Sequence, residues 1–170
     1  MSDTTGAPDR ARRAFSDHGS FEAAGEGDRY VSTSTAFDGA VTPAAAEDGR
    51  IRFDVTVTVP TLGAAAADHV ADVVEDGWFD TFAQRVADVG GVTRKSREFD
   101  VDVTRHEETV VVETSLVDIN EGRGVDDAAA VIDFVEGTYV QGIVPGYEYE
   151  GPAASLLSKA RRQGQAGGAP

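Results

Sequence analysis

The clearest pattern in the chain is a strict alternation of apolar and polar residues over Ile51–Val59. Every second side chain in this run is apolar, and Arg, Asp or Thr residues separate them. Successive side chains of a strand point to opposite faces, so the run predicts a strand with one buried and one solvated face. Shorter alternations predict a strand at Tyr30–Phe37 and a second hairpin from Phe99–Val103 and Val110–Leu116.

The strand at Tyr30–Phe37 is expected to pair with Ile51–Val59. The segment between them, residues 38–49, is rich in alanine and is flanked by Asp38-Gly39 and Asp48-Gly49. Asp-Gly dipeptides favour turns, so this segment is predicted to be a connection without a strand of its own.

A helical period dominates Gly63–Val89. Apolar residues recur there at steps of four, which predicts one amphipathic face, and Gly77 is a possible kink between two helices. Three further helices are predicted at Pro8–His18, at the apolar seam of Ala128–Tyr139, and at Pro152–Arg162. The members of the four-step stripe are Val70, Val74, Trp78, Phe82 and Val86.

The resulting order of elements is α-ββ-α-ββ-α-α. Hairpins that alternate with helices favour an α+β fold, a two-layer sandwich in which helices pack on one face of an antiparallel sheet of two hairpins. We expect a single domain over residues 8–163, with disordered ends at 1–7 and 164–170, where small and polar residues prevail.

The charge of the chain is unusual. Its 170 residues hold 30 acidic and 15 basic side chains, giving a net charge of −15, and the acids are scattered rather than gathered in a tail. Such self-repulsion is largely screened near 1 M salt, where the Debye length is about 3 Å. Together with only two lysines, this composition predicts a halophilic protein. There are no cysteines, secretory signal or long apolar run, so we expect a cytoplasmic protein that does not enter membranes.

Two segments carry a family resemblance. The runs at 74–82, which includes Trp78-Phe79-x-Thr81-Phe82, and at 136–149, which includes Pro145-Gly146-Tyr147, resemble an uncharacterised family of small acidic haloarchaeal proteins. The likeness covers most of 8–163 and implies no activity or catalytic residue. The order of elements is also similar to that of secretion-chaperone-like and YbjN-like proteins, which implies a dimeric partner-binding role at the level of topology alone.

Chemistry-bearing motifs are scarce. Three histidines lie in unrelated settings, and neither a nucleophile elbow nor a phosphate-binding loop occurs, so we expect no catalytic residue and no cofactor. In the string Asp118–Asp126, three oxygen-bearing residues match positions of a calcium loop, but Arg123 replaces its turn glycine and Ala129 its bidentate glutamate. We interpret the string as a strand-to-helix connection with Asp126 or Asp127 near the cap, and leave cation binding open.

Four aromatic residues are the candidates for partner binding: Trp78, Phe79, Tyr147 and Tyr149. Rings of this kind either cover the end of a core or anchor an interface. We expect a non-catalytic binding or adaptor module, chaperone-like and homodimeric or bound to another protein. The alternative is a small-ligand binder or enzyme with a pocket lined by Tyr139, Tyr147 and carboxylates. The last twenty residues carry +3 and the first 150 carry −18, but nucleic-acid binding is not expected, because salt weakens phosphate contacts steeply.

Overall fold

The computed structural model describes residues 6–25, 27–91, 93, 97 and 99–168, and within these residues six strands form one antiparallel sheet. The spatial order is β1-β2-β3-β4-β6-β5, so β3 and β4 lie at its centre, and β4 and β6 pair along their whole length. The strands are β1 (Phe21–Ala23), β2 (Tyr30–Ser32), β3 (Asp38–Ala45), β4 (Ile51–Pro60), β5 (Asp102–Arg105) and β6 (Thr109–Asp118).

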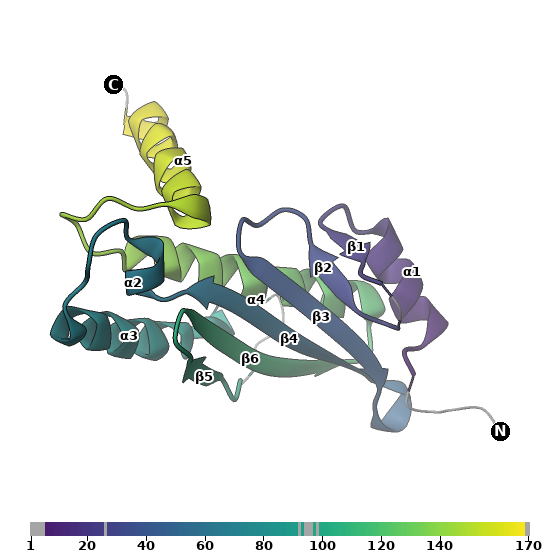
Figure 1. Ribbon diagram of the computed structural model, residues 1–170. Coiled ribbons are helices and arrows are strands. Elements are labelled where there is room, and N and C mark those ends of the chain that lie inside the picture. The colour runs from purple at the N-terminus through teal and green to yellow at the C-terminus, as the bar shows by residue number, and fades with distance from the viewer. Residues whose placement is uncertain (1–5, 26, 92, 94–96, 98, 169–170) are drawn as a thin grey trace.

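Helices pack on one face of this sheet, and α4 makes the main contact with the strands. In Figure 1, α4 crosses behind the strands, α1 and α3 lie near opposite ends of the molecule, and α5 projects away from both layers. The α+β fold is therefore confirmed. The helices are α1 (Asp9–Asp17), α2 (Leu62–Ala65), α3 (Asp72–Val86), α4 (Glu121–Gln141) and α5 (Gly151–Gly168), with single 3₁₀ turns at η1 (Glu47–Gly49) and η2 (Val89–Gly91).

The core lies between the sheet and α4. The apolar set of β4 points toward the helices and is buried, as the alternation predicts, together with every second residue of β6. Two glycines allow α4 to approach the sheet closely. A Cβ on Gly39 of β3 would lie 2.7 Å from Ile132 Cγ2, and one on Gly124 of α4 would lie 2.2 Å from Phe53 Cε2. Neither site has room for a larger residue.

The first hairpin differs from the prediction. Tyr30–Phe37 is wrong as a single strand, because β2 ends at Ser32, and the expected connection contains β3, which pairs with both β2 and β4. Side chains satisfy the backbone beyond β2. The Glu136 carboxylate accepts from the Ala36 N–H at 2.9 Å, and the Thr35 hydroxyl donates to the Phe37 carbonyl at 3.2 Å. Strand β1 also had no signal in the alternation.

The predicted helix over Gly63–Val89 is interrupted at residues 66–71 rather than at Gly77, which lies inside α3. The interruption has a long-range cause. The Ala67 N–H donates to the Glu148 carbonyl at 2.7 Å, and the Glu150 N–H donates to the Ala65 carbonyl at 2.8 Å. Pairing with this distant segment replaces the helical hydrogen bonds that α2 would otherwise continue.

The remaining boundaries agree less closely with the predictions. The hairpin of β5 and β6 is present, but β5 begins at Asp102, so Phe99 and Val101 precede it as half-buried coil. Helix α4 begins five residues before Asp126, and α5 continues to Gly168, past Arg162. The disorder expected at 1–5 and 169–170 lies outside the described residues, whereas Ala7 is buried and donates its N–H to Asp28 at 3.0 Å.

Candidate partner-binding surface

Trp78, the first aromatic candidate, faces the interior. It is 4% exposed, stacks on Phe82 with ring centroids 5.5 Å apart, and meets the edge of Tyr139 at 5.6 Å. The apolar stripe of α3 therefore places Trp78 against α4, as the four-residue spacing indicates. In an isolated copy of the chain this ring contributes to the core rather than to the surface.

Phe79 lies on the flank of α3 and is half-buried. The Arg105 guanidinium of β5 sits 4.8 Å from the centre of its ring, and the same guanidinium pairs with Asp76 at 3.0 Å. A cation over an aromatic face is attracted by the ring's quadrupole. The contact joins α3 to the edge of the sheet and occupies one side of the ring.

Tyr147 and Tyr149 lie side by side, with ring centroids 6.5 Å apart, on the segment that leads from α4 to α5. Both are half-buried. The Tyr149 hydroxyl donates to the Val144 carbonyl, and Tyr149 forms an isolated bridge with Ala66. Burial raises the pKa of Tyr149, and the nearby Tyr147 raises it further. The segment is thus fixed to α2, and an interface role for this pair stays a prediction.

Tyr139 and Tyr147, the residues expected to line a pocket in the alternative interpretation, do not share one among the residues that the structure describes. Tyr139 is 1% exposed and is enclosed by the rings of Phe37, Trp78 and Phe82. Burial raises its pKa, and the nearby Tyr149 and Glu75 raise it further. Neither Tyr139 nor Tyr147 lines the two grooves described below.

A charged network at the N-terminus of α4 occupies the string that resembles a calcium loop. Both Asp118 oxygens accept from Arg123 at 2.7 Å, and Arg97 also donates to Asp118. Arg97 reaches Asp127 at 3.0 Å and the Val117 carbonyl at 2.7 Å. The side chains of Asp118 and Asp127 are fully buried, and that of Arg97 is 7% exposed.

The network also determines the charge state of Asp118. Burial alone would raise its pKa, but hydrogen bonds from Arg123, the Asn120 N–H and Arg97 outweigh burial and hold the pKa far below the usual range. The Asn120 side chain, rather than Asp126 or Asp127, caps α4 by accepting from the Arg123 N–H at 2.8 Å. The string is a strand-to-helix connection whose first carboxylate is engaged by two guanidinium groups. Over the residues described, no group of three acidic or histidine side chains is arranged to hold a metal ion.

A groove of about 500 Å³ separates α1 from the start of α4. Its walls carry both signs of charge, and ion pairs cross it. His18 Nε2 lies 3.2 Å from Asp126, and Arg10 pairs with Glu121 at 2.9 Å while also donating to the Ile119 and Gly49 carbonyls. These contacts join α1, η1 and α4, so the groove belongs to the packing of the fold.

A second groove, of about 390 Å³, lies between α4 and α5. Its lining combines apolar positions on both helices with acidic residues of α4. No atom lies within 4 Å of the position that a Cβ on Gly137 would take, so the surface is open at this point. The lining residues are Ser34, Asp133, Glu136, Gly137, Val140, Gln141, Leu156, Lys159 and Ala160.

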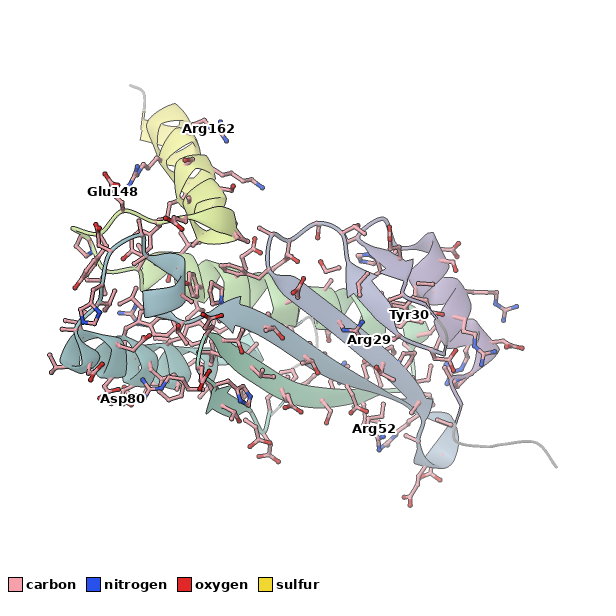
Figure 2. All side chains as sticks on the ribbon, viewed as in Figure 1. Arg29, Tyr30, Arg52, Asp80, Glu148 and Arg162 are labelled. Carbon is pink, nitrogen blue, oxygen red and sulfur yellow. The ribbon has the colours of Figure 1, made fainter. Side chains whose placement is uncertain are left out.

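Helix α5 forms the outer wall of this second groove. Ala153 and Leu156 are its buried residues among the described side chains, whereas Leu157 and Ala160 are half-exposed. Figure 2 shows Arg162 near the free end of α5, Glu148 on the segment that leads into α5, and Asp80 on α3. The sequence shows the +3 charge of the last twenty residues but not where the helix that carries it lies. The scarcity of large apolar residues after Leu157 was the available signal that the helix leaves the body.

In comparison with protein families, residues 16–159 match a family of unknown function, DUF5813. The chain belongs to this family. The match spans the strands, the α3–α4 core and the first turns of α5. Neither the curated proteins nor the solved structures compared with the chain gave a match. Within the described part of the DUF5813 chain, no helix is both long and apolar enough to cross a bilayer.

Proposed function

We propose that this DUF5813 protein is a non-catalytic protein-binding module whose binding element is α5. The carrying observation is the projection of α5 beyond the two-layer body. An 18-residue helix with little tertiary packing is marginal in water, because helices in proteins gain most of their stability from a buried face. A partner that covers Leu157 and Ala160 would supply the missing burial.

The charge of α5 indicates the chemistry of such a partner. Lys159, Arg161 and Arg162 are exposed, and residues 151–170 contain no acid. Charge complementarity favours an acidic protein surface. In concentrated salt, attraction acts only over a few ångströms, so the basic side chains would have to contact the partner directly.

The most strongly shifted titratable groups also favour a non-catalytic role. Catalytic acids and bases with shifted pKa values are usually accessible from a cleft. Here Asp118 is enclosed by arginines, and Tyr139 is enclosed by aromatic rings. Both shifts arise from the packing of the fold, and neither group borders the groove beside α5.

The test is a pair of charge variants with the same net charge. One variant carries Lys159→Glu, Arg161→Glu and Arg162→Glu, and the control carries Arg13→Glu, Arg29→Glu and Arg50→Glu at exposed positions of the body. Each is immobilised in concentrated KCl, exposed to native cell extract and analysed by quantitative mass spectrometry.

The proposal expects the wild type and the control to retain a common set of proteins, copies of the chain included, and the α5 variant to lose at least nine-tenths of it. Equal retention by both variants would contradict the role of α5. Retention of nothing by a monomeric wild type would contradict partner binding altogether.

A further inference from the structure

We propose that the partner of α5 is a second copy of the chain, and that α5 of each copy lies in the groove between α4 and α5 of the other. This inference rests on the binding role proposed for α5. The floor, the rim and the position of the groove each favour α5 of a second copy as its occupant.

The floor of the groove suits the close approach of a helix. Gly137 presents no side chain, lies on the exposed face of α4, and has open space above it. Val140 and Leu156 border it with apolar surface. Helices pack with their axes about 8–10 Å apart only when the side chains at the crossing are accommodated. The half-exposed Leu157 and Ala160 of an incoming α5 provide side chains of suitable size.

The α4 side of the groove is acidic and its α5 side carries Lys159, whereas the incoming helix is basic. Asp133 is exposed on the rim, and Glu136 lies one turn away, with one of its oxygens accepting from the Ala36 and Phe37 N–H groups. Arg161 and Arg162 of a second copy would meet these carboxylates. Contact pairs of this kind survive in salt better than long-range attraction does.

The position of the groove makes the exchange reciprocal. Because α5 is itself a wall of the groove, the donating and accepting surfaces adjoin each other. A two-fold axis beside the α4–α5 junction therefore brings both pairs together in one isologous interface. A head-to-tail contact with a distant groove would instead generate a ring or an open filament of copies.

The first test substitutes the floor. Gly137→Gln fills the groove, whereas the control Gly77→Gln places the same side chain on the exposed face of α3, where a Cβ would also meet no atom within 4 Å. Gln favours a helix more than Gly does, so neither variant should melt below the wild type. Sedimentation in concentrated KCl is expected to show a dimer for the wild type and the control. Gly137→Gln should raise the dissociation constant at least tenfold; an unchanged constant would overturn the inference.

The second test uses the absence of cysteine from the chain. A ¹⁵N-labelled Gly137→Cys variant is mixed with an unlabelled Ala160→Cys variant and oxidised. The inference expects a disulfide between labelled and unlabelled copies. Yield no greater than that from Gly77→Cys mixed with Ala160→Cys would contradict it.

The two proposals fail separately. A wild type that stays monomeric but retains other proteins through α5 overturns the second copy as partner and leaves the binding role standing. Equal retention by the two triple charge variants removes the basis for both.

Discussion

Helices α4 and α5 are similar in length, at 21 and 18 residues, yet they are stabilised in different ways. Nine residues of α4 are buried, and a charged network anchors its first turn to β6 and to Arg97. In α5, the buried residues among the described side chains are Ala153 and Leu156. The difference teaches that α4 is stabilised by its own chain, whereas α5 keeps a half-exposed face at Leu157 and Ala160, which we propose that a partner covers.

The largest expected effect lies at the buried end of α4. Asp118→Ala removes the buried carboxylate that Arg97 and Arg123 share and leaves Arg97 paired with Asp127, and breaking a buried pair costs about 3–5 kcal/mol of unfolding free energy. Urea denaturation in concentrated KCl measures the loss. Asp54→Ala is the control, because its pair with Arg52 at 3.2 Å is exposed and is expected to contribute under about 1 kcal/mol. Equal losses would show that the network does not anchor α4.

The contribution of Asp118 to the stability of α4 is also expected to depend on pH. The folded pKa of Asp118 is depressed, so the stability it contributes is present above its unfolded pKa of about 3.9 and is lost as the pH falls toward the folded value. Asp118→Asn should lack this component and lose less stability than the wild type between pH 4 and pH 2. Parallel loss in the two proteins would contradict a depressed pKa.

A smaller effect is expected at the contact of α4 with the sheet. Gly124→Ala places a Cβ 2.2 Å from Phe53 Cε2, and overpacking of this kind costs about 1–3 kcal/mol. Gly77→Ala, at an open position of α3, should instead gain up to about 1 kcal/mol from helix propensity. Thermal melts of both variants decide the point, and a gain for Gly124→Ala would show that α4 is not tightly seated.

The Tyr139 hydroxyl shows whether a polar group on the buried face of α4 costs stability when it lacks a hydrogen bond. It is buried and has no hydrogen-bond partner among the described residues, so Tyr139→Phe is expected to stabilise the fold by about 1 kcal/mol. Tyr149→Phe, which removes the bond to the Val144 carbonyl, should lose about as much. A loss for both variants in chemical denaturation would indicate that a bridging water holds the Tyr139 hydroxyl.

The smallest effect is expected on α5. Leu157→Ala removes a half-exposed side chain and should change the unfolding free energy of the monomer by under about 1 kcal/mol, whereas Leu156→Ala, at a buried position, should cost about 2 kcal/mol or more. Dilute samples in concentrated KCl give these values. Equal costs would mean that α5 packs on its own body along both residues.

The sequence predicted the elements whose signal is local. Strand β4 alternates without exception, and the stripe through Trp78 and Phe82 faces the core. Strand β3 gave no such signal, because close approach by Ile132 of α4 selects Gly39, and small residues resemble a loop in composition. A contact between positions so far apart in the chain cannot be inferred from either segment alone.

The candidate surface was harder to predict for the same reason. Trp78 and Tyr147 were predicted as candidates because their rings are large, but the exposure of these rings depends on how α3 and α2 pack. The basic charge of residues 151–170 was visible, yet the direction in which α5 leaves the body is a property of tertiary docking. Composition indicated the charge of the surface but not its position.

The topology of the sheet has a consequence for the newly made chain. Strands β1–β4 are complete at Pro60, but α4, which covers their apolar face, begins only at Glu121. At a synthesis rate of about 5–20 residues per second, this interval of about sixty residues lasts roughly 3–12 s. During that time Val55 and Val57 have no covering helix, while Asp38 and Asp54, on the opposite face, already carry charge. Until α4 is made, the apolar face of β4 lacks the helix that covers it in the folded chain.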